Sequence, residues 1–285
     1  MPKYRVLIAV VISLVMLLLP YGTAAADTKN RGLYISPPRD YITVEAGSSQ
    51  VQAFTVANLT DTTMTVDLTV KQFSMSDYIY DYQFRQPDND WLKLNLSRVE
   101  LKPNESKKIP YQLTIPPKTA PGGRYYTLFA SANLSKGSLS STVQATTLLY
   151  LTVNGQLVRT SVLQKDSIPW LVTGSTIPYK FNVKNTGNIH YSAYFYAQLR
   201  GVFGQISETG TGHLLMPGAV RTVTESIPSP LLPGIYQVTY GYKVDFAQII
   251  TNKTAYIVFI PPWSIVAFIL LIVAGRWMYR KKWPK

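Results

Sequence analysis

Residues 54–60 read Phe-Thr-Val-Ala-Asn-Leu-Thr, and residues 181–187 read Phe-Asn-Val-Lys-Asn-Thr-Gly. In both stretches an apolar side chain recurs at every second position until an asparagine is reached. Alternation with a period of two is typical of a strand that buries one face, and asparagine favours the turn that ends such a strand. The two stretches therefore predict the same strand and turn twice in one chain.

The similarity continues outward from these stretches in the same order and at similar spacing. A proline-marked turn, an Ile-Pro pair and a Pro-Gly corner follow in each copy, namely Leu101-Lys102-Pro103, Ile115-Pro116 and Pro121-Gly122 in the first and Leu215-Met216-Pro217, Ile227-Pro228 and Pro233-Gly234 in the second. A unit of about 110 residues with roughly seven short strands is typical of an immunoglobulin-like sandwich. The sequence predicts an all-β fold of two tandem immunoglobulin-like β-sandwiches, at residues 27–153 and 154–261, joined at Asn154-Gly155.

The first 26 residues have the three parts of a secretory signal peptide. Lys3 and Arg5 precede an apolar run from Val6 to Leu19, and alanines occupy positions 24–26. This order of basic, apolar and small residues predicts export and cleavage after Ala26. The alternative is an uncleaved anchor helix, which the shortness of the apolar run disfavours.

A second apolar segment, near the C-terminus, predicts a transmembrane helix. No charged residue occurs between Ala255 and Gly275, and the proline pair inside this segment suits the first turn of a helix rather than its middle. We therefore expect a last strand at residues 255–260, a membrane-spanning helix at residues 262–279 and a basic tail at residues 280–285. The alternative is a buried core helix, which the basic tail disfavours.

Basic and aromatic residues around this helix predict its orientation. By the positive-inside rule, the basic tail lies in the cytoplasm and both sandwiches lie outside the cell. The chain is then a single-pass protein of the cell membrane. The residues expected at the membrane interfaces are Trp263, Arg276, Arg280, Lys281 and Lys282.

The composition excludes several functional classes. The chain has no cysteine, which excludes disulfides and cysteine chemistry, and exported domains without disulfides are more typical of bacteria than of animals. The formal net charge is +13, but seven of the 28 basic residues flank the two apolar end segments. Because the others form no long basic run, the sequence predicts no nucleic-acid partner.

The segment Tyr78-Ile79-Tyr80-Asp81-Tyr82-Gln83-Phe84-Arg85 is the first candidate binding site. Its aromatic residues recur at every second position, so that in an extended strand they share one face. If that face is open, Tyr78, Tyr80 and Tyr82 form a surface beside Arg85 that fits a sugar or a peptide, with Trp91 at its end. The alternative is that this face is the core side of an added strand or hairpin.

The corner at residues 121–126 is the second candidate site. Its two glycines let a ligand approach the main chain, and Arg124 can pair with a carboxylate such as the terminus of a peptide. The matching corner at residues 233–236 has no arginine, which favours a structural role for the corner itself. In that case the tyrosine of each copy, Tyr125 or Tyr236, anchors a sandwich corner.

No sequence pattern indicates catalysis or a cofactor. His190 and His213 are the only histidines, and neither belongs to a hydrolase or zinc motif. The aspartates at positions 77, 81, 88 and 90 lack the spacing of a calcium-binding loop. We expect strand-end or surface histidines, solvated turn aspartates, no metal, no cofactor and no enzymatic activity.

The first predicted sandwich resembles the peptidoglycan-binding domain of the WxL-interacting surface proteins of Gram-positive bacteria. The similarity lies in five segments, residues 35–38, 54–60, 78–84, 99–106 and 116–123. Members of that family continue with a second immunoglobulin-like domain, a transmembrane helix and a basic tail, which is the layout predicted above.

The resemblance implies a non-catalytic cell-surface protein that binds peptidoglycan or another cell-wall polymer, or that docks other surface proteins to the wall. The alternative function is an adhesin or surface-assembly scaffold. Such a scaffold would bind a protein partner through an exposed sandwich face or an edge strand.

Overall fold

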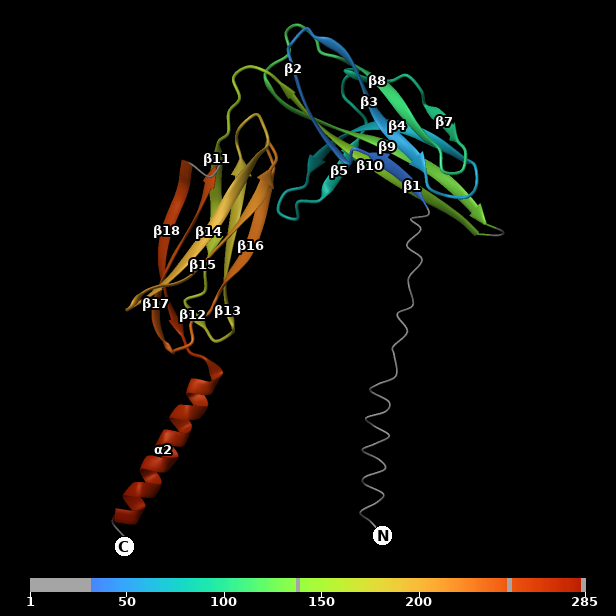
Figure 1. The fold of residues 1–285 in the computed structure, drawn as a ribbon. Coiled ribbons are helices and arrows are strands. Elements are labelled where there is room, and N and C mark those ends of the chain that lie inside the picture. Colours follow the sequence, from blue (N-terminus) through green and yellow to red (C-terminus); the bar gives the residue numbers. More distant parts are fainter. Residues whose placement is uncertain (1–31, 137–138, 245–247, 283–285) are drawn as a thin grey trace, which may run out of the picture. The chain divides into compact units, whose positions relative to one another are not determined.

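The computed structural model describes residues 32–136, 139–244 and 248–282, and most of them lie in strands (Figure 1). Strands make up 64% and helix 8% of the structure. The prediction of an all-β fold is therefore confirmed. The predicted signal peptide at residues 1–26 lies outside the described residues.

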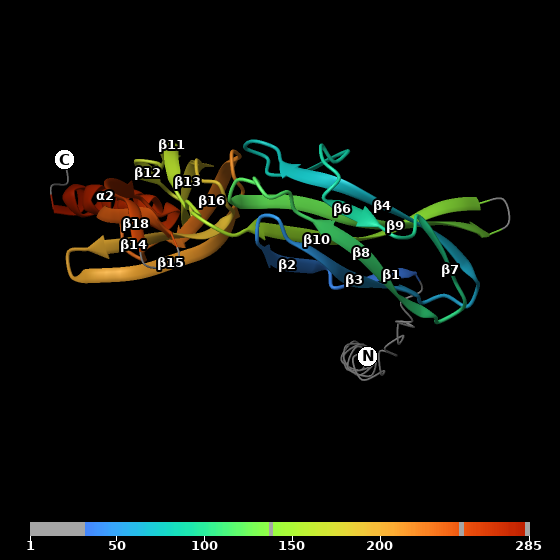
Figure 2. The same cartoon turned by 90° about the horizontal axis from the view of Figure 1, so that it is seen from above.

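Residues 33–153 form two sheets, here called the N-terminal sheet pair. The smaller sheet has the strand order β1 (Leu33–Ser36), β3 (Ser49–Asn58), β8 (Ser106–Thr114) and β6 (Leu92–Leu94). The larger sheet has the order β2 (Arg39–Val44), β10 (Leu139–Val153), β9 (Gly122–Lys136), β4 (Met64–Met75) and β5 (Tyr82–Arg85), and β7 (Arg98–Leu101) also pairs with β4. Figure 2 shows β9 and β10 extending together beyond the other strands of their sheet.

The two sheets share one apolar core. Alternate residues of each strand point inward, among them Phe54, Val56 and Leu113 from the smaller sheet and Leu128 and Leu151 from the larger, none more than 2% exposed. Two sheets that bury one face against each other form a β-sandwich. The strand predicted from residues 54–58 is β3, and its apolar side chains do face the core.

Residues 161–259 form two further sheets, here called the C-terminal sheet pair. One has the order β11 (Ser161–Ser167), β13 (Thr176–Asn185) and β16 (Val220–Pro228). The other has the order β12 (Leu171–Val172), β18 (Gln248–Phe259), β17 (Gly234–Val244), β14 (Tyr191–Gly201) and β15 (Gly204–Leu215). Their common core includes Phe181, Val183, Phe195, Val238 and Tyr242.

The sequence repeat is also a repeat of strand pairing. In each copy the first strand, β1 or β11, pairs antiparallel with the strand that contains the repeated Phe-x-Val-x-Asn stretch. The second strand, β2 or β12, crosses to the other sheet and pairs parallel with the last strand of the copy, β10 or β18. The two sheet pairs are therefore built to the same plan.

Helix α2 (Pro262–Lys282) follows β18 almost directly. It begins at a proline, because the first turn of a helix needs no N–H at that position. The predicted helix stopped at residue 279, but the observed helix continues through Lys282, so that half of the expected basic tail is helical. The predicted last strand was also too short, since β18 begins at Gln248 and not at residue 255. In both cases backbone hydrogen bonding continues past the local composition boundary on which the prediction relied.

Residues 262–279 of α2 are long and apolar enough to cross a membrane, by length and composition, and none of them is buried in the protein. Trp263 lies at the start of this stretch and Arg276 near its end, and both are solvent-exposed. The backbone of residues 280–282 is helical, whereas the side chains of Arg280, Lys281 and Lys282 lie outside the described part of the chain.

Candidate functional site

Strand β5 presents two exposed aromatic rings, those of Tyr82 and Phe84. The rings stack at 6.1 Å between centroids with an interplanar angle of 9°. Phe84 also meets the buried Phe129 edge to face at 5.1 Å, and Tyr82 meets the buried Phe73 at 5.5 Å. About two fifths of each outer side chain is exposed, 39% for Tyr82 and 42% for Phe84. We call these four residues the aromatic ledge.

The backbone beside the aromatic ledge is open. β5 is the last strand of its sheet and pairs only with β4, from Gln72 opposite Arg85 to Met75 opposite Tyr82. All four residues of β5 are exposed. In the described residues no strand covers its outer edge, so this edge offers free N–H and C=O groups to an added strand.

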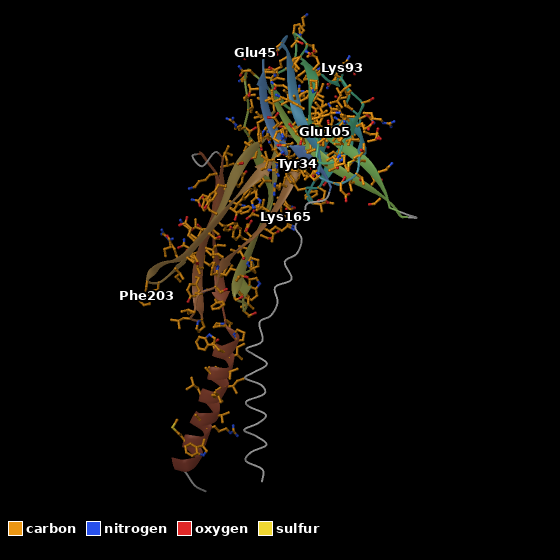
Figure 3. The ribbon with its side chains drawn as sticks, turned by 45° about the vertical axis from the view of Figure 1, so that its right-hand side comes forward. Tyr34, Glu45, Lys93, Glu105, Lys165 and Phe203 are labelled. Atoms are coloured by element: carbon orange, nitrogen blue, oxygen red, sulfur yellow. The ribbon has the colours of Figure 1, made fainter. Side chains whose placement is uncertain are left out.

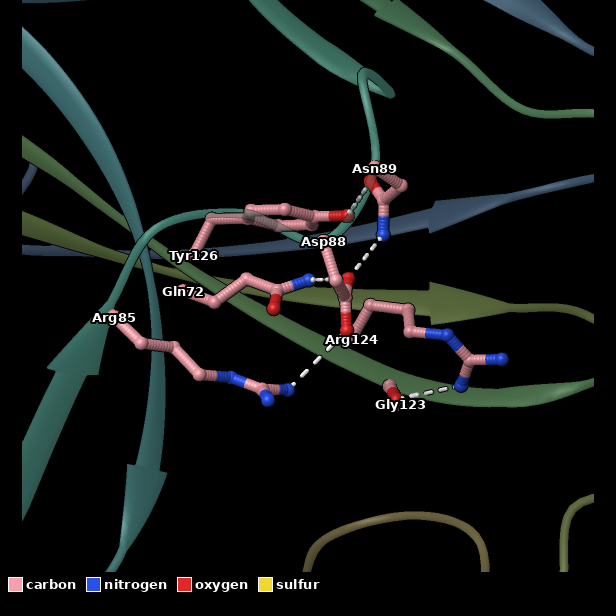
Figure 4. Close-up of polar contacts among 7 residues, drawn as sticks. All are labelled: Gln72, Arg85, Asp88, Asn89, Gly123, Arg124 and Tyr126. Atoms are coloured by element: carbon pink, nitrogen blue, oxygen red, sulfur yellow. Dashed lines mark hydrogen bonds and ion pairs between the residues drawn. The ribbon is translucent and has the colours of Figure 1, made fainter.

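A network around Asp88 fixes the chain that leaves β5 (Figure 4). One carboxylate oxygen of Asp88 accepts hydrogen bonds from Gln72 Nε2 at 2.6 Å and from Asn89 Nδ2 at 2.8 Å. The other lies 3.3 Å from an Arg85 guanidinium nitrogen. Asn89 Oδ1 in turn accepts a hydrogen bond from the Tyr126 hydroxyl at 2.8 Å. The network therefore ties the loop after β5 to β4 and β9.

Arg124 contacts its own corner and the Trp91 ring. The Arg124 guanidinium donates to the carbonyl of Gly123 at 2.9 Å and lies 5.5 Å from the centre of the Trp91 ring. These contacts support the structural role of the corner at residues 121–126. The tyrosine anchor holds for one copy only, since Tyr236 donates to its own corner at Leu232 O, 2.7 Å away, whereas the Tyr125 hydroxyl bonds His190.

The prediction that Tyr78, Tyr80 and Tyr82 share one face of a strand is wrong. Tyr78 and Tyr80 have φ of 65° and 62°, in the left-handed region, so the chain is not extended there and β5 begins only at Tyr82. The Tyr78 N–H donates to Val220 O at 2.7 Å. These two tyrosines therefore lie against the C-terminal sheet pair and not on the ledge.

Tyr80 is held by hydrogen bonds and a ring contact. Its hydroxyl donates to Leu214 O at 2.7 Å and accepts from the Met216 N–H at 2.6 Å. The Arg221 guanidinium lies 4.2 Å from the centre of its ring. Burial raises the pKa of the Tyr80 hydroxyl, and the Met216 N–H and the Arg221 charge oppose that rise. These structural contacts account for the position of Tyr80 without any ligand.

The histidines occupy structural positions. His190 packs against the rings of Tyr125 and Tyr150, and burial, followed by the charge of Arg159, lowers its pKa to about 4. His213 Nε2 lies 2.8 Å from Glu225 Oε1. In the described ranges no group of three or more His, Asp or Glu residues is arranged to hold a metal ion.

Two of the four predicted aspartates, Asp77 and Asp88, are tied into the fold, whereas Asp81 and Asp90 are solvent-exposed as expected. Asp77 accepts from the Val220 N–H at 2.7 Å, and Asp88 is the centre of the network described above. Tyr82 and Arg85 thus share strand β5 but point to opposite faces of it, Trp91 and Arg124 contact each other, and Tyr78 and Tyr80 bind the C-terminal sheet pair.

Sequence reasoning missed two members of the aromatic ledge. Phe73 and Phe129 are buried although they lie on the outward face of their sheet. Their only sequence signal was an aromatic residue at an outward-facing position, since the neighbouring outward positions Thr69, Lys71 and Thr127 are polar. Such an aromatic residue among polar neighbours does not indicate that the outer face is covered.

Comparison with known proteins gives no family. No model of a protein family matches the chain, and a search of curated proteins returns no match. The solved structures that resemble the chain include chaperones of bacterial fimbriae and pili and a PapD-like domain of human CEP192. The class 5 fimbriae chaperone CfaA has a TM-score of 0.45 at 11% identity over 81% of this chain and 100% of its own.

Two other similar structures have lower TM-scores. The chaperone CsuC of Acinetobacter baumannii, solved with the tip subunit CsuE, has a TM-score of 0.36 at 15% identity over 67% of this chain and 89% of that chain. The E. coli chaperone DraB has a TM-score of 0.35 at 14% identity over 79% of this chain and 97% of its own. At these scores and identities the comparisons assign no function.

Proposed function

We propose that this chain is a non-catalytic, membrane-anchored scaffold that docks an extended segment of another surface protein along strand β5. The observation that supports the proposal is that strand β5 combines an open backbone edge with the stacked, half-exposed rings of Tyr82 and Phe84. Added strands gain affinity from main-chain hydrogen bonds and specificity from contacts of alternate side chains. The open edge of β5 offers the main-chain groups, and the aromatic ledge offers the side-chain contacts.

The rigidity of the aromatic ledge favours binding. Tyr82 and Phe84 each rest on a buried ring, so a partner need not immobilise them. Rigid aromatic side chains are typical anchors of protein interfaces because little conformational entropy is lost when they are covered. Arg85 points to the opposite face of β5, where its guanidinium lies 3.3 Å from the Asp88 carboxylate.

The membrane anchor in this proposal is α2. An exposed apolar helix of this length has no stable place in water, and lipid would cover it. Arg276 and the basic residues at positions 280–282 then lie at the cytoplasmic interface, with the strands outside the cell.

Wall-polymer binding is the second candidate function. A sugar ring can stack on Tyr82 or Phe84, whose rings share one face of β5, whereas Gln83 and Arg85 point to the opposite face. Peptidoglycan binding, implied by the resemblance to the WxL-interacting proteins, therefore stays a prediction for the same surface.

The test is a selection of random 12-residue peptides displayed on phage, panned on the full chain in detergent micelles. We expect enriched peptides with alternating apolar residues. The Tyr82→Ser/Phe84→Ser variant should bind them at least about 10-fold more weakly, roughly 1.4 kcal/mol, as is typical for loss of aromatic anchors.

The control is Tyr34→Ser/Val51→Ser, which removes two exposed apolar side chains from the smaller sheet and should leave binding unchanged. A parallel sedimentation of the same three proteins with insoluble peptidoglycan separates the two candidates. Peptidoglycan binding that the ledge variant loses, without peptide enrichment, would move the assignment to wall binding. Absence of both kinds of binding would contradict both functions.

A further inference from the structure

A second apolar surface lies on the C-terminal sheet pair, far along the sequence from the ledge. The β14–β15 hairpin, the connection from β16 to β17 and the first residues of β17 form it, and together they line a depression of about 480 Å³. Its outward apolar side chains are Val202, Phe203, Leu231, Leu232 and Ile235, each more than 60% exposed. We call these five residues the apolar tip. Figure 3 shows Phe203 at the very end of its hairpin.

The strand register locates the apolar tip at the end of the sheet where the chain enters α2. Arg200 of β14 pairs with Gln237 of β17, and Gly234 at the start of β17 pairs with Phe259 at the end of β18. Phe203 follows Arg200 by three residues and therefore reaches about the level of Phe259. Helix α2 begins three residues later, at Pro262, which corresponds to roughly 10 Å of strand rise.

The second loop lies at least as close to the helix. Leu231 and Leu232 precede Gly234, the first residue of β17, so they lie at the end of the sheet or past it. The Tyr236 hydroxyl donates to Leu232 O at 2.7 Å, which holds this loop in place. The apolar side chains are thus presented by a fixed loop at the level where the chain meets the proposed membrane.

The chemistry of the two loops fits lipid. No residue that lines the depression is charged. Soluble surfaces rarely expose a contiguous apolar patch of this kind without a partner to cover it. Apolar and aromatic side chains insert into the boundary between lipid headgroups and acyl chains, where burial of each apolar group lowers the free energy.

We infer that the apolar tip inserts into the lipid leaflet that α2 enters at Pro262, as a second membrane attachment of the C-terminal sheet pair. This inference rests on the proposed membrane anchoring by α2. The covering partner is the bilayer itself, because the tip and the start of α2 lie at the same end of one sheet. With two attachments, the sheet pair is held at the membrane surface instead of pivoting about the short connection to α2.

The absence of cysteine allows a direct test with single-cysteine variants of the full chain. Leu231→Cys, Leu271→Cys and Val51→Cys are each labelled with an environment-sensitive fluorophore and reconstituted in phosphatidylcholine–phosphatidylglycerol vesicles that contain nitroxide lipids. Leu271 reports on the middle of α2, and Val51 is an exposed control on β3. Phe203→Cys serves as a second reporter of the tip.

We expect a deep nitroxide to quench the label at position 271. A shallow nitroxide should quench the label at position 231 at least roughly twofold more than the label at position 51. Quenching at 271, with labels at 231 and 203 no more quenched than that at 51, would overturn the insertion of the tip and leave the anchor intact. Lack of quenching at 271 would overturn the anchor, and quenching at 231 would then show that the tip binds lipid without it.

Discussion

Two buried asparagines hold equivalent turns in the two sheet pairs. Asn58 and Asn185 end β3 and β13, and neither is exposed to solvent. Asn58 Nδ2 donates to Leu101 O at 3.1 Å, and Asn185 Nδ2 donates to Leu215 O at 3.0 Å. Each side-chain oxygen also accepts the backbone N–H two residues on, from Thr60 or Gly187. The repeated asparagine thus joins its own turn to the proline-marked turn of its copy.

Replacing Asn185 by leucine should destabilise the protein by roughly 3 kcal/mol, because buried partner groups lose their hydrogen bonds. The measurement is urea unfolding followed by tryptophan fluorescence. Asn182→Leu is the matched control on the same strand, since Asn182 is only half-buried and accepts one hydrogen bond from Thr222. Equal losses of stability in the two variants would show that the buried amide has no special role.

At the level of elements, the segment between β4 and β5 shows how distant contacts override a local pattern. Residues other than glycine rarely adopt a positive φ, because their Cβ then crowds the backbone. Tyr78 and Tyr80 both do so, and hydrogen bonds to Val220, Leu214 and Met216 offset the cost. The segment is held by another part of the chain and not by its own sequence.

Tyr80→Phe should loosen this segment while leaving its ring in contact with Arg221. The variant loses both hydrogen bonds of the hydroxyl and leaves the Met216 N–H without its partner, a cost of about 1–2 kcal/mol. We expect faster hydrogen–deuterium exchange of the Met216 amide, measured on the full chain in detergent. Tyr78→Phe is the control, because Tyr78 binds Val220 through its backbone. An unchanged exchange rate in Tyr80→Phe would refute the assigned role.

At the level of the whole molecule, the half-buried His190 connects the two sheet pairs. The Tyr125 hydroxyl of β9 accepts from the His190 backbone N–H at 3.0 Å and lies 3.0 Å from His190 Nδ1. Its own proton is then available for Nδ1, which leaves the proton of the neutral ring on Nε2. Burial lowers the pKa of His190 to about 4, from an ordinary value of 6.5.

The lowered pKa predicts a loss of stability in acid. An unfolded chain takes up a proton at His190 below about pH 6.5, whereas the folded chain resists it until about pH 4. The stabilising effect is therefore complete above pH 6.5 and declines as the pH falls from 6.5 toward 4. Allowing for solvent screening of this partly exposed ring, we expect a loss of about 1–2 kcal/mol.

Urea unfolding of the parent and of His190→Gln at pH 7 and pH 4.5 measures this effect. All other titrating groups are shared, so the difference between the two proteins isolates His190. We expect the parent to lose more stability than the variant over this interval. A parallel decline of both proteins would show that other groups account for the acid sensitivity.

The amino-acid sequence by itself determined the all-β class, the repeated strand with its terminal asparagine, and the start of the helix at Pro262. These features follow from backbone geometry over a few residues, since side chains alternate in a strand and proline fits a first helical turn. The family resemblance and the domain boundaries stay predictions.

Only the tertiary structure decided which aromatic residues form a surface. Tyr82 and Phe84 stay on the edge strand, whereas Tyr78 and Tyr80 bind residues more than 130 positions away in the chain. In the two equivalent Pro-Gly corners, the hydroxyl of Tyr236 bonds its own loop, whereas that of Tyr125 bonds His190. A local pattern contains no information about such partners, because the free energy that selects them comes from packing between segments that meet only after folding.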